Sequence, residues 1–143
     1  MTLLETARHA RDTQNPQLLA DAVPFARLLG LRLELRGDEL TGVMPANRRL
    51  LGNPVLESLH GGATAGIIEC VASLALLWRA PMTVVPRPLE FTVDFLTSGK
   101  LEPVHAHARI LKLGRRVANV HVEAWQSDRS RPIGAGHGNY LLT

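Results

Sequence analysis

The chain has 143 residues, of which 45% are hydrophobic, and a formal net charge of +3. This length fits about one domain with a buried core. The positive charge is too mild and scattered to indicate a nucleic-acid-binding protein, although arginine suits small phosphate-bearing ligands. We expect a single domain over residues 1–143, with an N-terminal helical segment (1–29) followed by a sheet and a central helix (30–143).

Cysteine content and the N-terminus narrow the class of protein further. Cys70 is the only cysteine, so the chain cannot form an internal disulfide, and its apolar neighbours predict a core residue rather than a nucleophile. The N-terminal stretch MTLLETARHARD lacks the apolar core of a secretion signal. No uncharged apolar run approaches the ~20 residues that span a bilayer. We therefore expect a cytoplasmic protein without a membrane partner.

Helical and alternating patterns follow one another in the first part of the chain. The predicted elements are a helix over 2–12, a helical stretch over 17–29, a strand over 31–36, a strand over 39–44 and a loop over 46–59. Pro24 either starts a new turn or kinks the second helical stretch. Gly37-Asp38 between the two strands suits a tight hairpin turn. The loop is long for a compact domain, and loops of this length are often functional.

The centre of the chain is the run HGGATAGIIECVASLALLW, from His60 to Trp78. Between Gly61 and Trp78 the only charged residue is Glu69. A run that is apolar all round predicts a helix over about residues 61–78, buried on every face. A carboxylate there is costly unless it has partners or a chemical role, so Glu69 is the first candidate for a functional residue.

Strand patterns dominate the rest of the chain. Alternating apolar and polar residues, or glycine-rich apolar residues, predict strands over 89–96, 104–113, 117–125 and 133–142. Two-stranded ribbons and lone helices are not stable by themselves. We therefore predict an α+β fold in which one curved antiparallel sheet wraps around the long central helix.

This arrangement resembles the hotdog fold, and more closely the phenylacetate-type (PaaI-like) group of acyl-CoA thioesterases. The segments that carry the resemblance are Pro24 to Gly30, the His60-Gly61-Gly62 opening of the helix with Glu69 nine positions after the histidine, Leu89 to Leu96, and Leu113 to Ala118. The resemblance covers roughly residues 24–142. It implies a thioester hydrolase whose coenzyme A is part of the substrate, with no separate cofactor.

The resemblance also implies roles for single residues. Glu69 would be the catalytic carboxylate, as general base or as nucleophile, and the backbone N–H of Gly61 would polarise the thioester carbonyl. Ser73 would help to hold the attacking water. Asn53, with Asn47 as the alternative, would be supplied near the carboxylate of a partner subunit. Because active sites of this family form between two subunits, a homodimer or a dimer of dimers with shared sites is implied.

The helix itself supports part of this chemistry without the resemblance. A helix N-terminus offers unpaired N–H groups, and Gly61 and Gly62 let a ligand approach them closely. At 1.5 Å rise per residue, Glu69 lies roughly 12 Å along the axis from Gly61, which favours a site shared by two chains. His60 either takes part in acid–base chemistry or fixes the loop by a hydrogen bond.

Several basic residues are candidates to bind the phosphates of coenzyme A. They are Lys112, Arg115 and Arg116 in one turn, with Arg48 and Arg49 as further candidates. Gly62 at the helix start is a separate candidate to bind coenzyme A. The alternative for each charge is a solvated surface residue. His105, His107 and His121 have no closing carboxylate or cysteine at metal spacing, so we predict no metal site.

Two other functions are compatible with the sequence. A hotdog dehydratase or hydratase pairs a helix carboxylate with a loop histidine, but in a proline-rich context that His60-Gly-Gly does not match. The other is a non-catalytic acyl-CoA-binding or regulatory protein. A regulator would need a DNA-binding element, and residues 1–30 lack a basic recognition helix. An assay that shows whether coenzyme A thioesters are consumed or only bound distinguishes an enzyme from a binding protein.

Overall fold

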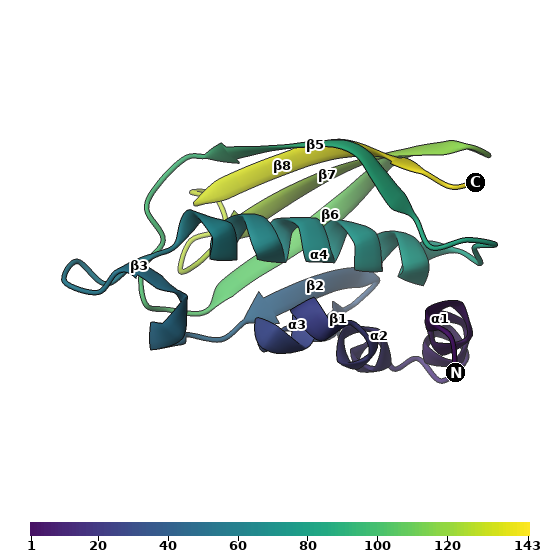
Figure 1. The fold of residues 1–143 in the computed structure, drawn as a ribbon, viewed down its shortest axis with the longest axis horizontal. Coiled ribbons are helices and arrows are strands. Elements are labelled where there is room, and N and C mark those ends of the chain that lie inside the picture. The colour runs from purple at the N-terminus through teal and green to yellow at the C-terminus, as the bar shows by residue number, and fades with distance from the viewer.

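A curved, six-stranded antiparallel sheet wraps around one long helix, as Figure 1 shows for this computed structural model of residues 1–143. The helix is α4 (Gly61–Arg79), and the strand order is β1-β2-β6-β7-β8-β5. The strands are β1 (Arg32–Arg36), β2 (Glu39–Met44), β5 (Arg87–Phe95), β6 (Val104–Leu113), β7 (Val117–Trp125) and β8 (Gly134–Leu141). This architecture confirms the α+β hotdog fold and the central helix.

Strand alternation places one face of the sheet against α4. On β6, Val104, Ala106 and Ala108 are buried, whereas His105 and His107 lie on the convex face away from the helix. The helix approaches the sheet closely at β8. A Cβ added at Gly136 would lie 2.5 Å from Cγ2 of Ile68, so only glycine fits there. The concave face of the sheet and α4 therefore form the hydrophobic core.

The ends of α4 follow from its sequence. His60 is its N-cap, with an extended backbone and a side chain that accepts a hydrogen bond from the N–H of Gly62. Pro81 follows the C-cap residue and cannot continue a helix. By length and composition alone α4 could cross a membrane. In the fold, however, most of it is buried by the sheet and the N-terminal helices, as in a core helix.

The prediction that α4 is buried on every face is wrong for the single chain. Gly61, Gly62 and Glu69 are exposed, and Ala65 and Ser73 are half-buried. Positions 61, 65, 69 and 73 recur every four residues, so they form one stripe along the helix. We call these four residues the open stripe of α4. The sheet covers only part of the helix circumference, and this stripe is left uncovered.

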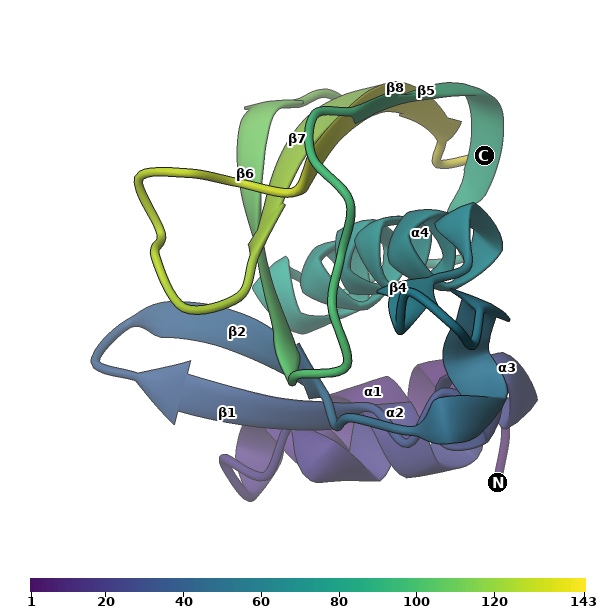
Figure 2. The same cartoon turned by 90° about the vertical axis from the view of Figure 1, so that its left-hand side faces the viewer.

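Three short helices form a layer beside α4 and β1, which Figures 1 and 2 show below the long helix. They are α1 (Leu3–Asp12), α2 (Gln17–Ala22) and α3 (Pro24–Leu28). A capping box between Thr2 and Glu5 begins α1. Pro24 begins α3 rather than kinking a longer helix. The guanidinium of Arg11 donates to the carbonyl oxygen of Leu77 and so fastens this layer to α4.

The loop before α4 contains some regular structure. A single 3₁₀ turn (Arg48–Leu50) leads into a small hairpin of β3 (Leu51–Asn53) and β4 (Ser58–Leu59). The hairpin projects beyond the N-terminal end of α4 (Figure 1). Its tip exposes Val55 and Leu56, which are 90% and 74% accessible. These apolar side chains have no cover within the chain.

Candidate active site

The N-terminal end of α4 presents one unpaired backbone donor. Nδ1 of His60 accepts a hydrogen bond from the N–H of Gly62 at 2.8 Å, so that N–H is not free for a ligand. The N–H of Gly61 has no hydrogen-bond partner, and Gly61 is exposed. The ring of Phe95 borders it, since a Cβ added at Gly61 would lie 3.3 Å from Cε1. Gly61 is therefore the donor that a carbonyl oxygen can reach.

The hydrogen bond of His60 gives this residue a structural role. An imidazole that accepts through Nδ1 carries its proton on Nε2, and its orientation is fixed by the helix start. The alternative in which His60 fixes the loop thus agrees with the geometry. The glycine at position 62 supplies space, because a Cβ there would lie 2.9 Å from Nδ1 of His60.

Glu69 lines a pocket of about 280 Å³ between α4, the N-terminal layer and the α4–β5 connection. Ser73, one turn further along the open stripe, is the other lining residue whose side chain carries an oxygen. The remaining residues are apolar or weakly polar: Leu3, Val23, Phe25, Cys70, Leu74, Leu77, Val85 and Pro86. A carboxylate and a hydroxyl therefore lie together beside an apolar pocket.

Cys70 lies against the same pocket but is buried. Burial, and secondarily the charge of Glu69, raises the pKa of its thiol to about 11. The thiolate is the nucleophilic form of cysteine, so Cys70 is a poor nucleophile at neutral pH. Its position agrees with the predicted core role.

Behind Ser73 lies a residue that the sequence reasoning missed. Oγ of Ser73 donates to Oη of Tyr140, at a long 3.4 Å. Tyr140 comes from β8, is fully buried, and packs edge-on against Phe91 with ring centroids 6.1 Å apart. Burial raises the pKa of Tyr140 to about 12, so its phenol stays protonated at neutral pH. The available sequence signal was modest: Tyr140 is the only tyrosine, in a glycine-rich strand.

The loop asparagines lie away from Glu69 of their own chain. Oδ1 of Asn53 accepts from the N–H groups of Val55 and Leu56, both at 3.1 Å, and so shapes the β3–β4 turn. Oδ1 of Asn47 accepts from the N–H of Arg49 at 2.9 Å and caps the 3₁₀ turn. The hairpin lies beyond the N-terminal end of α4, whereas Glu69 is in the middle of that helix. A single chain does not bring either asparagine to its own Glu69.

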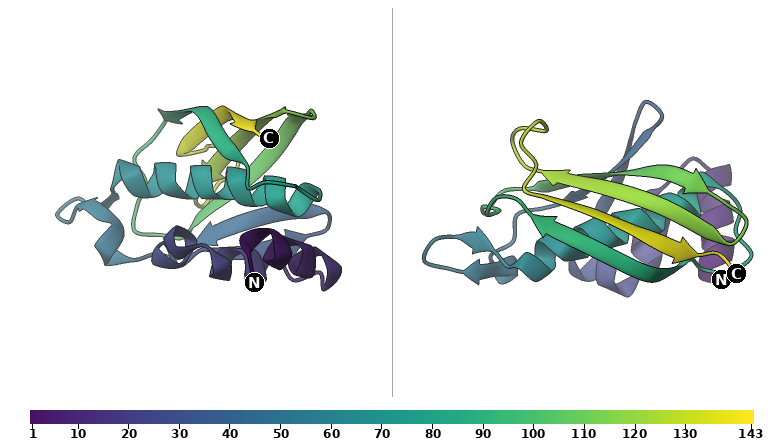
Figure 3. Two further views of the ribbon diagram at one scale, coloured as in Figure 1. Left: turned by 45° about the vertical axis from the view of Figure 1, so that its right-hand side comes forward. Right: turned by 90° about the horizontal axis from the view of Figure 1, so that it is seen from above.

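The predicted basic turn lies at the other end of the molecule. Arg115 and Arg116 are exposed in the β6–β7 turn, and Lys112 is exposed at the end of β6 just before it. The carbonyl oxygen of Arg116 accepts from the N–H of Leu142, which places the turn beside the C-terminus. The views from the side and from above put this end near the C-terminal end of α4 (Figure 3). Within one chain, the basic turn and Gly61 are thus far apart.

The other arginine candidates differ in their surroundings. Nη1 of Arg48 is 2.5 Å from Oε2 of Glu57, so its charge is already paired. Arg49 is exposed and has no side-chain bond. Of the two, Arg49 is the one left for an anion.

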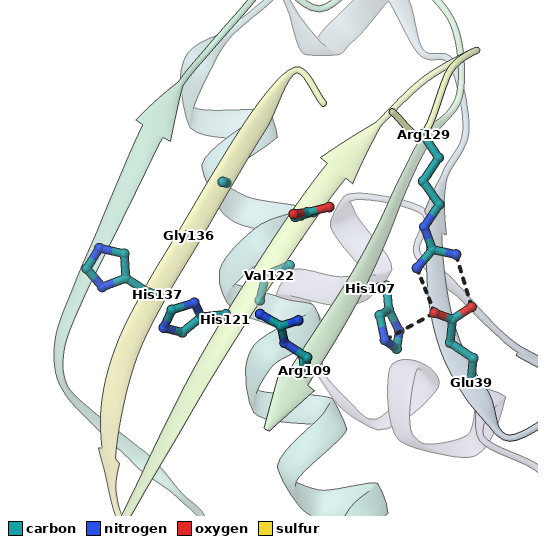
Figure 4. A pocket seen from close by; sticks show the side chains of 10 residues that line it. Glu39, His107, Arg109, His121, Val122, Arg129, Gly136 and His137 are labelled. Carbon is teal, nitrogen blue, oxygen red and sulfur yellow. Dashed lines mark hydrogen bonds and ion pairs between the residues drawn. The ribbon is translucent and has the colours of Figure 1, made fainter. Parts of the chain in front are cut away.

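A second hollow, of about 360 Å³, lies on the convex face of the sheet and is polar (Figure 4). Glu39 binds the guanidinium of Arg129 at 2.6 and 3.1 Å and Nε2 of His107 at 3.2 Å. His121 and His137 face each other across β7 and β8, with ring centroids 5.5 Å apart. No group of three or more histidine, cysteine or acidic side chains is placed to hold a metal ion. This hollow is separated from Glu69 by the sheet.

Comparison with known proteins agrees with the fold and the helix. Residues 53–138 match the family described as acyl-CoA thioesterase N-terminal domain. A crystal structure from Chromobacterium violaceum is similar with a TM-score of 0.80 and 31% identity, covering 97% of each chain. A comparison with curated proteins found no match.

Two PaaI proteins share the fold at lower identity. PaaI from the phenylacetic acid degradation operon of E. coli has a TM-score of 0.72 at 16% identity, covering 96% of this chain and 94% of its own. A variant of PaaI from Thermus thermophilus has a TM-score of 0.71 at 22% identity, covering 85% of this chain and 100% of its own. The match over residues 53–138 includes the whole of α4. The chain therefore belongs to the acyl-CoA thioesterase family, and its hotdog fold is PaaI-like.

Proposed function

We propose that the protein hydrolyses acyl-CoA thioesters at a site built on the open stripe of α4. The observation that carries this proposal is the placement of Glu69 and Ser73 one turn apart on the wall of an apolar pocket. A carboxylate in such a place acts as general base on water or as nucleophile on the carbonyl carbon. In this proposal the apolar pocket binds the acyl group, and Glu69 and Ser73 lie beside the thioester.

Ser73 favours the water route. Because its hydroxyl proton is directed to Tyr140, the oxygen lone pairs of Ser73 are left to accept from water. A water that donates to both Glu69 and Ser73 is oriented for attack while Glu69 removes its proton. The nucleophilic route would instead form an acyl-enzyme on Glu69. Intact-protein mass spectrometry during turnover distinguishes the two, since the water route leaves no acylated protein.

The carbonyl of the same thioester needs an oxyanion donor that Glu69's own helix does not supply nearby. Gly61 and Glu69 are eight residues apart, which is roughly 12 Å along the helix axis. We therefore assign the Gly61 N–H of one copy and the Glu69 carboxylate of a second copy to one site. A donor aimed at the developing oxyanion contributes about 3 kcal/mol to transition-state stabilisation.

The exposed edge of the sheet supports assembly of two copies. β5 pairs only with β8 and leaves its other edge free, as Figure 3 shows from above. Phe95 and Leu96 at its end are exposed, as are Val55 and Leu56 at the hairpin tip. Exposed apolar side chains beside an unpaired strand edge are typical of an interface. The open stripe would be covered by the same contact.

Pairing of two β5 edges would also bring the basic turn to the site. β5 runs from Arg87, beside the C-terminus, to Phe95, beside Gly61. The register Arg87–Leu141–Val117 places the basic turn near the Arg87 end. Antiparallel pairing around a two-fold axis sets each Arg87 end beside the Phe95 end of the other copy. Lys112, Arg115 and Arg116 of one copy would then lie toward the Gly61 end of the other, where they bind coenzyme A phosphates.

The test is thiol release from acyl-CoA substrates by wild type, Glu69→Gln and the control Glu102→Gln. Glu102 is exposed and its side chain makes no hydrogen bond, so the control changes the same charge outside the site. We expect Glu69→Gln to lower kcat/KM by about two to four orders of magnitude and Glu102→Gln to leave it unchanged. Binding of thioesters without any release of thiol by wild type would contradict hydrolysis and favour a binding protein.

A further inference from the structure

The pocket beside Glu69 is walled by the N-terminal layer of the same chain. Leu3 from α1, Val23 between α2 and α3, and Phe25 from α3 line one side of it. The other side is α4, and Val85 and Pro86 line it from the α4–β5 connection. The three N-terminal residues are apolar and come from a part of the chain outside the sheet and the central helix.

The position of Phe25 depends on a glycine in α4. A Cβ added at Gly66 would lie 3.0 Å from Cζ of Phe25 and 3.4 Å from Leu29, so the absence of a side chain lets the ring approach the helix. Phe25 is nevertheless 45% exposed, because its outer side faces the pocket and solvent. A large apolar side chain is thus held at the pocket wall by close packing on α4.

The length of the pocket along α4 gives the size of the ligand. Glu69 and Leu77 both line it and lie eight residues apart, roughly 12 Å along the helix. An extended chain advances about 1.2 Å per bond, so this length corresponds to roughly ten bonds.

We propose that this pocket binds the apolar acyl tail of a medium-length thioester of up to about ten carbons, and that the N-terminal layer sets the length limit. This inference rests on the proposed thioesterase function. Glu69 is the only charged group in the lining, which excludes a polar or charged tail at the far end. Leu3, Val23 and Phe25 act as specificity residues, while Glu69 and Ser73 address the thioester at the near end.

The test is a kcat/KM profile over acyl-CoA substrates from two to sixteen carbons. Val23→Phe fills the pocket, and Leu3→Ala enlarges it. Burial of each methylene changes affinity about fourfold. We expect Val23→Phe to lower kcat/KM for the longer acyl chains by about this factor per excluded methylene and to leave acetyl-CoA unchanged. We expect Leu3→Ala to move the optimum to longer chains.

Leu28→Ala is the matched control, because Leu28 lies on the same helix as Phe25, is 72% exposed and is not part of the pocket lining. A profile that stays the same in both pocket variants, with wild type active, would overturn the inference and leave the thioesterase function standing. If wild type hydrolyses no thioester, calorimetric titration with decanoyl-CoA and with coenzyme A decides separately. Tighter binding of decanoyl-CoA that Val23→Phe abolishes supports the pocket, and equal binding of the two ligands overturns it.

Discussion

At the scale of single residues, the candidate site depends on which polar atoms already have hydrogen-bond partners within the chain and which are free for a ligand. His60 occupies the N–H of Gly62, and Oδ1 of Asn53 is occupied by its own turn. The N–H of Gly61 remains unpaired at the start of α4. Glu69 can be identified as a candidate from the sequence alone, because it is the only charged residue in an apolar run. The other candidates differ in their hydrogen-bond partners. These partners depend on the backbone geometry, which the residue types alone do not reveal.

Tyr140→Phe tests the link from β8 to Ser73. Phenylalanine keeps the packing on Phe91 and removes the acceptor of the Ser73 hydroxyl. A neutral hydrogen bond contributes about 1 kcal/mol, so we expect the free energy of unfolding to fall by no more than about this amount. Loss of an equal amount of positioning energy at Ser73 lowers kcat/KM about fivefold. Ser73→Ala should cost at least as much, and the double variant should cost no more than Ser73→Ala. Additive losses in the double variant would show that the two residues act independently.

The Glu39 network on the convex face makes a pH-dependent contribution to stability. Hydrogen bonding from Arg129 lowers the pKa of Glu39 below 4.5, its ordinary value. A carboxylate whose pKa is lowered by folding stabilises the fold at pH values above its ordinary pKa. This stabilisation is lost as the pH falls through the pKa of the folded state. These groups are partly exposed, so we expect Glu39→Gln to destabilise by no more than about 1 kcal/mol at pH 7. Urea unfolding should show this difference shrinking below pH 4.5; a constant difference would contradict the assignment.

At the scale of elements, periodicity predicts the strands and the helix well and the exposed surface of the helix poorly. Alternation over 104–113 and 117–125 gives both strands and their inward faces, because one face of each is buried by α4. The apolar run of α4 predicts burial on all sides, yet its open stripe is uncovered in the single chain. Composition cannot distinguish a surface buried by the same chain from one reserved for another. Nor could it show that residues 1–29 wall the pocket, because that depends on how the layer packs.

Gly136→Ala tests the close packing of β8 on α4. The added Cβ would lie 2.5 Å from Cγ2 of Ile68 on α4 and 2.8 Å from Cε1 of Phe91 on β5, so these side chains must shift. Overpacking of this kind costs about 1–3 kcal/mol, which we expect as a lower urea midpoint. His137→Ala changes the next residue, on the convex face, and should leave the midpoint within about 0.5 kcal/mol of wild type. Equal midpoints for Gly136→Ala and wild type would contradict the close packing of β8 on α4.

At the scale of the whole molecule, the uncovered features gather on one side. The free edge of β5, the open stripe of α4 and the apolar hairpin tip all lack partners within the chain. A two-fold assembly through β5 would cover the strand edge and bring each Gly61 toward the other copy's Glu69. Within one chain, Gly61, Glu69, Asn53 and the basic turn lie apart. The proposed chemistry requires Gly61 and Glu69 in one site, and the two-fold assembly would supply them from different copies.

Gly61→Pro provides a specific knockout of the proposed oxyanion donor. Proline fits the first position of a helix and lacks only the N–H that is unpaired there. His60, which precedes it, already has the extended backbone that proline requires, with φ −64° and ψ 133°. Gly61→Ala adds a side chain beside Phe95 but keeps the N–H, so it is the matched control. We expect the proline variant alone to lose about two to three orders of magnitude in kcat.

The measurement that tests the account most directly is thiol release by a re-associated mixture of Gly61→Pro and Glu69→Gln. If the site is shared, each variant alone lacks one half of both sites of its dimer, whereas a mixed dimer contains one intact site. Random exchange then restores about a quarter of wild-type activity. A mixture as inactive as its two components, with exchange of subunits verified by mass spectrometry, would show that Gly61 and Glu69 of one chain serve the same site and would contradict the shared-site account.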